Sequence, residues 1–491
     1  MIVYLTAILV TLFSLFVFLD SMHMFQLNSY KADIHLKWLR RNLFRVYFGG
    51  VKNSGKKAKK PLVYTHRVIR MCVTMAIIYA ALVFVIVCFS DFRNLAGLVI
   101  MSPLFPIIVN AINSPFEKAN NNRYIKEAKR IIDSMPNLIT IGITGSYGKT
   151  STKYYLHKLL SAKYETLMTP ESYNTTLGVV KTIRNELKPT HEYFVCEMGM
   201  MWAGDIAELC KIAKPKHTMI TSIGPQHLET MKTQENIIEE KFSITDCVSG
   251  KDGGMLFLNF DNGFISERAK KLDSDKAIIR YGVEPDTEAE YKATNISVTE
   301  DGTMFTIIAK GENREFITPL IGKHNVQNII GAIAIAHSMG ISLEELALPV
   351  KRLECAPHRL ELIKKDGLTI IDDTFNSNPV GAKAALETLK LLGGETALKI
   401  LITPGMVELR EKTYELNRQF GVDAADCCDY VVLIGEKQAI PILEGLLEAG
   451  FDKTKIKVYN DVNDGMKYAT ELDSGDKKKV ILLENDLPDN Y

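Results

Sequence analysis

The sequence predicts an α/β protein in which two parallel-sheet domains follow a group of helices able to cross a membrane. Three observations support this fold class. Long apolar stretches occur near the N-terminus. From about residue 138, short apolar runs alternate with helical stretches, as in parallel sheets covered by helices. A glycine-rich turn with a Lys-Thr pair joins the first of these runs to a helix. The length of 491 residues leaves room for two or three domains.

Three segments near the N-terminus are long and apolar enough to span a bilayer, at about residues 2–19, 71–90 and 95–113. The first lacks a basic leading region and a small-residue cleavage site, so we expect an anchor rather than a cleaved signal peptide. Pro103 and Pro106 should kink the third segment, which could be re-entrant. A buried helix of a soluble domain is the alternative for the second and third segments.

Residues 20–70 form a basic block with twelve Lys or Arg residues and two acidic residues. Positively charged loops stay on the cytoplasmic side, so we predict a multi-pass protein of the cell membrane whose soluble domains are cytoplasmic. Because the block lies between apolar segments, its expected partners are membrane lipids, including anionic headgroups, and not nucleic acid. Eight cysteines without a CxxC spacing suit a reducing compartment and indicate neither disulfides nor a zinc site.

After the third apolar segment, a polar linker helix is predicted within residues 117–137. A central domain is predicted over residues 138–357, with strands at 139–143, 193–197, 217–223, 254–259 and 277–281 and helices at 150–162, 203–212, 234–248 and 325–339. The two-residue periodicity of 290–317 predicts a small antiparallel appendage. A second alternating set predicts a Rossmann-like C-terminal domain over residues 358–491, with strands at 369–371, 399–402, 430–434, 456–458 and 480–483.

The turn between the first predicted strand and its helix has the sequence TGSYGKTS. Its glycines allow backbone N–H groups to approach an anion, and the N-terminus of a helix favours negative charge. Lys149 could then reach the β- and γ-phosphates of a nucleotide, and the Thr150 hydroxyl could ligate Mg²⁺. Ile143 stands where the strict pattern has glycine, so the match is to a shortened form, and an ordinary glycine turn is the alternative. The pattern predicts a P-loop-type central domain that binds a nucleoside triphosphate through Gly145, Ser146, Gly148, Lys149, Thr150 and Ser151.

Polar side chains follow the ends of other predicted strands. Glu197 and His227 follow two strands of the central domain, and Asp372 and Asp373 follow the first strand of the C-terminal domain. Ligands of open α/β sheets bind beyond the carboxyl ends of strands, where a carboxylate can ligate the Mg²⁺ of a bound triphosphate. Each residue alone has an alternative reading as a strand-end turn or a helix cap. Their occurrence together with the phosphate loop favours a binding site.

Eight motifs in order along the chain make this sequence resemble the Mur ligase family, the ATP-dependent enzymes that build the stem peptide of peptidoglycan. Within the family it is most similar to the members that add D-alanyl-D-alanine to a UDP-N-acetylmuramoyl-tripeptide. The likeness begins at about residue 138 and continues to the end of the chain. The motifs are TGSYGKTS at 144–151, NTTLGV at 174–179, CEMG at 196–199, TSIGPQHLE at 221–229, EEKF at 239–242, GKHNVQNIIGAIA at 322–334, PHRLE at 357–361 and DDTFNSNP at 372–379.

The resemblance implies roles for single residues. Lys149 and Thr150 would hold the phosphates and Mg²⁺, and Glu197 and His227 would be metal ligands. Lys241 matches a lysine that is carbamylated in many members, where the added carboxylate supports a second Mg²⁺. From the sequence alone, Lys241 is a lysine on the surface of a helix. The residues expected to take part in catalysis are Lys149, His227, Lys241 and Arg359.

Further positions are implied on the nucleotide and substrate sides. Asn325 and Asn328 match a helix that contacts adenine, and their alternatives are a helix cap and a solvent-facing position. Arg359 matches an arginine that reaches the γ-phosphate, and Asp373 matches a residue near the ribose. The expected substrate-side residues are Asn174, Thr175, Asn376 and Asn378.

By resemblance, the expected chemistry is the activation of a carboxylate in peptidoglycan precursor synthesis. ATP phosphorylates the acid, an amine such as D-alanyl-D-alanine attacks the acyl phosphate, and ADP and phosphate leave. Residues 1–116 stand where soluble members have a domain that holds UDP, which favours a lipid-linked precursor as the partner. The alternatives are a poly-γ-glutamate-type synthetase and a non-catalytic, nucleotide-sensing membrane scaffold. The sequence leaves the oligomeric state open.

Overall fold

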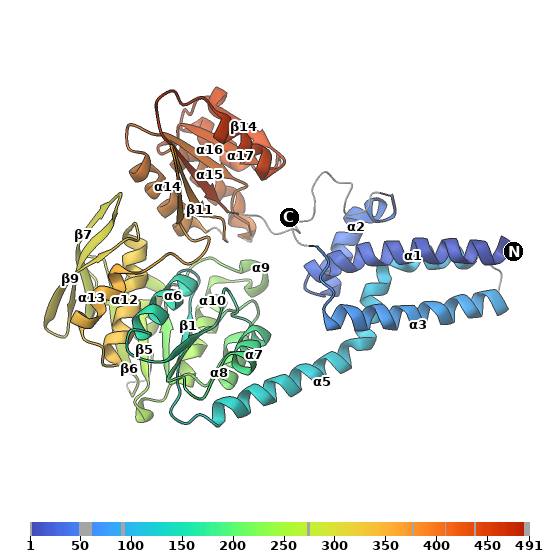
Figure 1. Cartoon of the computed structure of the whole chain (residues 1–491), viewed down its shortest axis with the longest axis horizontal. Helices are drawn as coiled ribbons and strands as arrows, with labels where there is room; N and C mark the ends of the chain where they lie inside the picture. Colours follow the sequence, from blue (N-terminus) through green and yellow to red (C-terminus); the bar gives the residue numbers. More distant parts are fainter. Residues whose placement is uncertain are drawn as a thin grey trace. The chain divides into compact units, whose positions relative to one another are not determined.

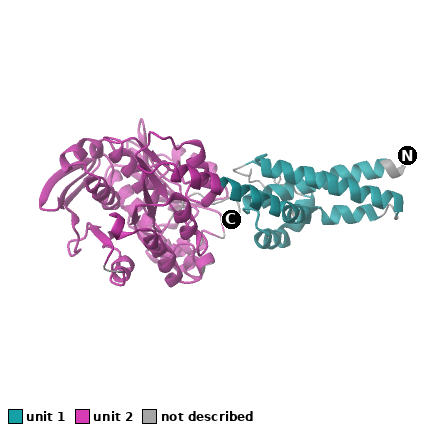
Figure 2. Cartoon of the chain, turned by 90° about the horizontal axis from the view of Figure 1, so that it is seen from below, with its two compact units in different colours: residues 1–124, 487–491 teal, residues 125–486 magenta. Residues whose placement is uncertain are grey.

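The computed structural model describes residues 2–48, 61–89, 94–272, 275–375, 378–407, 409–436 and 438–485. The chain divides near residue 124 into two units, which Figure 2 shows in different colours. Because the second unit contains both predicted sheets, the limits predicted for the two soluble domains, 138–357 and 358–491, stay predictions.

The apolar stretches near the N-terminus fold into long helices in the first unit (Figure 1). Three helical segments, Leu5–Leu27, His66–Phe89 and Leu95–Asp133, are long and apolar enough to cross a membrane, and each overlaps one predicted span. Many of their large apolar side chains are exposed, as expected of helices that face lipid. The elements are α1 (Ile2–Leu27), α2 (Ala32–Phe48), α3 (His66–Phe89), α4 (Leu95–Met101), the 3₁₀ turn η3 (Ser102–Leu104) and α5 (Phe105–Asp133).

Two features of this unit differ from the sequence prediction. The basic block, predicted to be a loop, contains helix α2, because Leu39 and Val46 lie on one face of it and pack against α1. The linker helix predicted within residues 117–137 is not a separate element. Helix α5 begins in the third apolar segment and continues through most of the predicted linker, to Asp133. Pro115 lies inside α5, where a proline removes one backbone donor but need not end the helix.

The third apolar segment, in which the prolines were expected to cause a kink, is interrupted by the 3₁₀ turn between α4 and α5. Proline has no backbone donor, so the carbonyl group four residues before each proline lacks its usual helical partner. Hydroxyl groups from other helices donate to further carbonyl groups near the turn. The Ser21 hydroxyl donates to the Pro103 carbonyl at 2.7 Å, and the Tyr47 hydroxyl donates to the Ile100 carbonyl at 2.6 Å. Interrupted helices at membrane depth need such internal partners, so the turn is compatible with a membrane-embedded segment.

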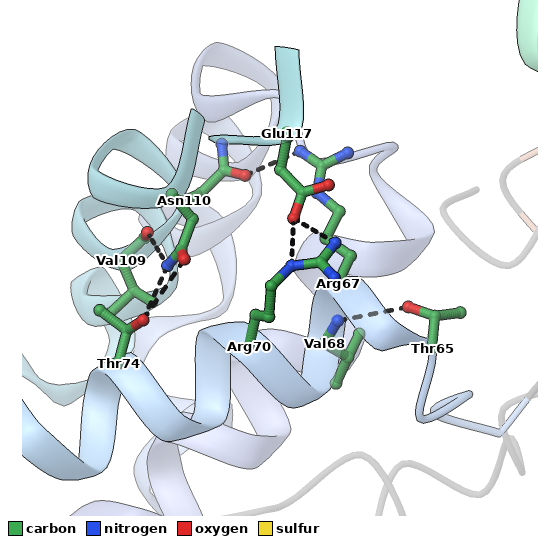
Figure 3. Close-up of polar contacts among 9 residues, drawn as sticks. Thr65, Arg67, Val68, Arg70, Thr74, Val109, Asn110 and Glu117 are labelled. Carbon is green, nitrogen blue, oxygen red and sulfur yellow. Dashed lines mark hydrogen bonds and ion pairs between the residues drawn. The ribbon is translucent and has the colours of Figure 1, made fainter. Parts of the chain in front are cut away.

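A polar seam joins the start of α3 to the middle of α5 (Figure 3). On each helix its members recur every three to four residues, so they lie on one face. The donor–acceptor distances are 2.8 Å for Arg67–Asn110, 2.6 Å for Arg70–Glu117 and 3.0 Å for Thr74–Asn113. The seam therefore holds the start of the second apolar helix beside the end of the third apolar segment, as a helical hairpin requires.

Reversing one charge of the seam should destabilise the first unit. In the Arg70→Glu variant two carboxylates would face each other, with the Glu117 side chain only 11% exposed, and we expect a loss of about 2 kcal/mol. Exchanging the two residues, as Arg70→Glu with Glu117→Arg, should restore most of the stability because the ion pair forms again in the opposite sense. Thermal unfolding of the full chain in detergent measures both. An exchanged variant as unstable as Arg70→Glu would contradict the pairing.

In the second unit, the first sheet has nine strands in the order β2-β3-β1-β4-β5-β6-β7-β8-β9. The predicted antiparallel appendage is confirmed as β7, β8 and β9, but it extends the main sheet, because β7 pairs with β6. The three-residue β2 was too short to predict. The strands are β1 (Ile139–Thr144), β2 (Thr166–Met168), β3 (Tyr193–Glu197), β4 (His217–Ile220), β5 (Met255–Asn259), β6 (Ala277–Gly282), β7 (Tyr291–Thr299), β8 (Gly302–Ala309) and β9 (Glu312–Thr318).

Helices α6 and α12 pack on the same face of this sheet, over the side chains of Ile141, Ile143 and Val195. Helix α12 is buried along most of its length, because residues 326–336 carry no charge. The helix predicted at 234–248 is α-helical only to Phe242 and continues as a 3₁₀ turn. The helices are α6 (Lys149–Leu160), α7 (Thr176–Asn185), α8 (Asp205–Ala213), α9 (Leu228–Met231), α10 (Gln234–Phe242), α11 (Gly263–Ala269), α12 (Lys323–Ser338) and α13 (Leu343–Lys351).

The second sheet has six strands in the order β10-β11-β15-β12-β13-β14, all parallel except β10, which confirms a Rossmann-like α/β architecture. Helices α14, α15 and α16 pack on one face, and α17 packs on the other. The exposed and charged edge strand β10 was not predicted. The elements are β10 (Glu361–Lys365), β11 (Leu368–Asp373), α14 (Pro379–Gly393), β12 (Leu398–Thr403), α15 (Thr413–Ala425), β13 (Tyr430–Ile434), α16 (Ile440–Glu448), β14 (Ile456–Tyr459), α17 (Val462–Glu471) and β15 (Lys479–Glu484).

Candidate active site

The phosphate loop, residues 144–151, connects β1 to α6 (Figure 1). Gly145 and Gly148 have φ angles of 155° and 80°, a region that L-residues with side chains rarely adopt. A Cβ atom at Gly145 would lie 2.0 Å from Thr221 Oγ1, and one at Gly148 would lie 2.4 Å from Asn328 Oδ1. Both positions therefore require glycine, and the loop backbone lies close against its neighbours.

Hydrogen bonds of Ser146 attach the loop to the segment after β4. Its backbone N–H donates to the Ser222 carbonyl at 2.7 Å, and its hydroxyl donates to the Gly224 carbonyl at 3.1 Å. Ser151 lies in the first turn of α6. The loop is thus held in shape by the protein itself.

Lys149 is half-buried, and its side chain curls back over the loop. Its Nζ donates to the Gly145 carbonyl at 2.6 Å and to the Ser146 carbonyl at 3.3 Å. Burial lowers the pKa of Lys149 to about 8, the charge of Glu197 opposes this change, and the charge of Arg359 adds to it. A bound triphosphate would bring negative charge and favour the ammonium form, so the side chain suits phosphate binding.

Glu197 ends β3 directly beside β1 and has only 1% of its surface exposed. Its Oε1 accepts hydrogen bonds from the Thr150 hydroxyl at 3.2 Å and from Asn174 Nδ2 at 3.0 Å, and its Oε2 lies 3.0 Å from Lys153 Nζ. Burial alone would raise the pKa of Glu197, but the lysine charges, Lys153 first, and the hydrogen bonds lower it overall. The fold brings three predicted residues, Thr150, Asn174 and Glu197, into direct contact around an ionised carboxylate.

Lys153 was not predicted as part of the site. It lies one helical turn after Lys149, on the same side of α6, and its side chain is fully buried. The four-residue spacing of these two lysines is the signal in the sequence that could have revealed it.

His227 and Lys241 lie close enough to Lys149 for its charge to influence both. Burial, then Lys149 and Lys241, lower the pKa of His227 to about 4, so its imidazole is neutral at pH 7 and can ligate a metal. The interpretation of Lys241 as a surface lysine is wrong, because its residue is only 2% exposed. Its neighbour Glu240 accepts backbone hydrogen bonds at the start of α8, which turns this part of α10 toward the core. Burial is the main reason that the pKa of Lys241 lies well below its ordinary value.

The two asparagines of α12 bind other parts of the protein. Asn325 Oδ1 accepts from the Tyr155 hydroxyl at 2.8 Å, and its Nδ2 donates to the Ile321 carbonyl at 2.9 Å. Asn328 Oδ1 accepts from the Thr152 hydroxyl at 3.3 Å and lies beside the phosphate loop. Asn325 is neither a helix cap nor exposed to solvent, and adenine contacts of either residue stay predictions.

Arg359 stacks on the Phe375 ring, with 4.6 Å from the guanidinium carbon to the ring centre. Burial lowers the pKa of Arg359, while the charges of Asp373 and Glu197 oppose this. Asp373 ends β11 and accepts from the Leu360 backbone N–H at 3.2 Å. Burial raises the pKa of Asp373 to about 6, against the charge of Arg359. The charge of Arg359 thus acts on the pKa of Lys149, and the charge of Glu197 acts on the pKa of Arg359.

Two predicted substrate-side residues are helix caps. Thr175 caps α7 by accepting from the Gly178 N–H at 3.4 Å, and Asn378 caps α14 by accepting from the Gly381 N–H at 2.9 Å. Asn376 lies outside the described residues. Substrate contacts of all three stay predictions.

The donor groups beside the phosphate loop fit Mg²⁺. The Thr150 hydroxyl and the ionised Glu197 carboxylate lie 3.2 Å apart, and Mg²⁺ is held in proteins by carboxylates together with phosphate oxygens and waters. His227 offers a nitrogen, which is a less typical ligand for this ion. Thr150 and Glu197 are therefore the residues best suited to hold Mg²⁺ on a bound triphosphate.

The chain matches two models of one enzyme family. Residues 143–336 match the Mur ligase middle domain, and residues 358–483 match the Mur ligase, glutamate ligase domain. The UDP-N-acetylmuramoyl-tripeptide–D-alanyl-D-alanine ligase of Bacillus subtilis (strain 168) is 34% identical over 346 residues, covering 70% of this chain and 72% of that protein. The enzyme of the same name from Escherichia coli (strain K12) is 28% identical over 319 residues, covering 64% and 69%.

Solved structures agree with these matches. MurF from Acinetobacter baumannii superposes with a TM-score of 0.67 and 26% identity, covering 76% of this chain and 78% of that one. The MurF ligase of Thermotoga maritima, solved in complex with ADP, gives a TM-score of 0.63 and 25% identity over 74% and 80%. With its phosphate loop, its two sheets and these relatives, the chain belongs to the Mur ligase family and is an ATP-dependent ligase that forms amide bonds.

Proposed function

We propose that this enzyme joins D-alanyl-D-alanine to the carboxylate of a peptidoglycan precursor at the cytoplasmic face of the cell membrane, using ATP and Mg²⁺. The observation that carries this proposal is the gathering of Lys149, Thr150, Glu197 and Arg359 at one end of the first sheet. The names of the similar relatives support the choice of substrates. The C-terminal match extends the likeness to the family beyond the central domain.

In the proposed reaction, the γ-phosphoryl group of ATP passes to an oxygen of the substrate carboxylate. The amine nitrogen then attacks the acyl carbon, and phosphate leaves. Lys149 would donate to the β- and γ-phosphates, and Arg359 would stabilise charge on the transferred group. Mg²⁺, held by Thr150 and Glu197, would neutralise further negative charge. Movement of the domain that carries Arg359 would complete the site and keep water from the acyl phosphate.

Phosphate release by the purified full chain in detergent tests this function. We expect release to require both UDP-N-acetylmuramoyl-tripeptide, or its lipid-linked form, and an amine, with D-alanyl-D-alanine as the best amine in a panel. The mass of the product should equal the sum of both substrates less one water. Release with glutamate alone would favour the polymer synthetase, and nucleotide binding without any product would favour the scaffold.

The three apolar helices support a further part of the proposal, that the carboxylate substrate is lipid-linked and that membrane lipids surround the first unit. The full chain in vesicles should use a lipid-linked precursor about tenfold or more better in kcat/KM than the UDP-linked form, because both are held at one surface. Deleting residues 1–116 should remove activity on the lipid-linked substrate while ATP still binds. Equal use of both substrates by the full chain would contradict this part.

We also propose that Lys241 is carbamylated, in line with the family. Its burial favours the neutral amine, whose nitrogen attacks CO₂ while a proton leaves to solvent. With ¹³C-labelled bicarbonate, the full chain should show a carbamate signal by NMR that is lost in Lys241→Gln and kept in Lys232→Gln, a change at an exposed lysine. The same signal in wild type and Lys241→Gln would contradict the assignment.

A further inference from the structure

Lys153 lies beside the site, but the proposed reaction steps give it no role. Its ammonium contacts two oxygen atoms, Glu197 Oε2 at 3.0 Å and the backbone carbonyl of Glu171. The side chains of Lys153 and Glu197 are 0% and 1% exposed. A buried ammonium is costly unless it is paired and hydrogen-bonded. The ammonium of Lys153 therefore needs both contacts, the Glu197 carboxylate and the Glu171 carbonyl, to be stable in its buried position.

The Glu171 carbonyl belongs to a segment that leads from β2 toward α7, residues 169–174, which we call the 169–174 loop. Both ends of this loop are attached to the end of β3. The Glu197 backbone N–H donates to Thr169 Oγ1 at 3.1 Å, and Asn174 Nδ2 donates to Glu197 Oε1 at 3.0 Å. Between these ends, Glu171 has a φ of 42°, which is unfavourable for a residue with a side chain. Lys153 donates to the carbonyl of this residue.

The two oxygens of the Glu197 carboxylate have separate partners. Oε1 faces Thr150 and Asn174, whereas Oε2 faces Lys153. A carboxylate held at both oxygens cannot rotate freely, so Lys153 keeps Oε1 directed at Thr150. That is the position where the donor groups fit Mg²⁺.

We propose that Lys153 is a positioning residue that fixes the Glu197 carboxylate and the 169–174 loop together. It thereby couples the metal side of the site to Asn174 on the substrate side, and this last part rests on the proposed function. Without the ammonium, the loop should open locally and Glu197 should lose its fixed orientation. The phosphate loop should keep its shape, because its own hydrogen bonds do not involve Lys153.

Hydrogen exchange of the full chain in detergent, without nucleotide, tests the proposal. In Lys153→Met, the amides of the 169–174 loop should exchange about tenfold faster than in wild type. Lys158→Met, a change at an exposed lysine of the same helix, should leave this exchange unchanged. Because the readout needs no substrate, it remains valid if the proposed substrates are wrong. Unchanged exchange in the loop of Lys153→Met would overturn the proposal.

A second variant covers the case in which Lys153→Met loosens the whole domain. Lys153→Met with Glu197→Gln removes the carboxylate that would otherwise be left buried without its partner. Fast exchange confined to the loop in this double variant supports the proposal, and fast exchange throughout the domain overturns it. In the single variant, KM for the carboxylate substrate should rise more than KM for ATP. Equal increases in both KM values would overturn the proposed coupling between Lys153 and the substrate side of the site.

Discussion

Replacing Lys149 by alanine should lower kcat/KM for phosphate release by about 10³-fold or more. The ammonium is held at the phosphate loop by the Gly145 carbonyl, and in the proposed reaction its loss would remove a preorganised positive charge beside the transferred phosphoryl group. Because the ammonium lies against the phosphate loop, where the triphosphate is expected to bind, ATP binding should weaken as well. A coupled phosphate assay with both substrates measures the first effect, and equilibrium titration with ATP and Mg²⁺ measures the second.

Two controls belong to this experiment. Lys158→Ala changes an exposed lysine of the same helix and should leave turnover within about twofold of wild type. The thermal midpoint of Lys149→Ala should stay close to that of wild type, since loop shape depends mainly on Ser146 and the two glycines. If Lys149→Ala turned over as fast as wild type, the assignment of the phosphate loop as the ATP site would be wrong.

Replacing Arg359 by alanine should lower kcat by about 10²-fold to 10³-fold with a smaller change in KM for ATP. Its guanidinium influences Lys149 and is balanced by Asp373 and Glu197. In the proposed reaction it would stabilise the charge that develops during transfer. Arg359→Lys should recover only part of the rate, because an ammonium lacks the planar group that stacks on Phe375. Steady-state measurement of kcat and of KM for ATP in wild type, Arg359→Ala and Arg359→Lys tests this prediction.

The matched control is Arg352→Ala, which changes an exposed arginine shortly before the same motif and should have little effect. If Arg359→Ala kept the wild-type kcat and changed only KM, the residue would bind nucleotide without acting on the transferred group. The proposed role in the transfer would then be wrong.

Local chemistry made much of the fold predictable. The alternation of apolar runs and helical stretches predicted most strands of both sheets, and the glycines at 145 and 148 predicted a loop in which side chains do not fit. Carboxyl ends of parallel strands meet at one edge, so Glu197 could be placed beside the phosphate loop. The two prolines predicted the interruption of the third apolar segment.

Other features depend on which face of a helix packs inward, which one sequence shows weakly. Lys241 looks like a surface lysine, yet α10 packs it into the core. Lys153 follows Lys149 by one turn, but the carboxylate that balances it comes from β3, far away in the sequence. Asn325 has a polar amide that could serve a ligand, but Tyr155 and the Ile321 carbonyl already occupy both of its ends. These pairings follow from tertiary packing and not from local pattern.

Transfer of ¹⁸O from the carboxylate substrate to inorganic phosphate tests the central claim most directly. If the γ-phosphoryl group passes to the substrate carboxylate, one of its labelled oxygens must leave with phosphate when the amine attacks. With a substrate labelled in the reacting carboxylate, we predict one ¹⁸O in the phosphate released for each amide bond formed, and labelled phosphate released about 10³-fold more slowly by Lys149→Ala. Unlabelled phosphate from the wild-type enzyme, with oxygen derived from water, would show hydrolysis of ATP instead and would contradict the account.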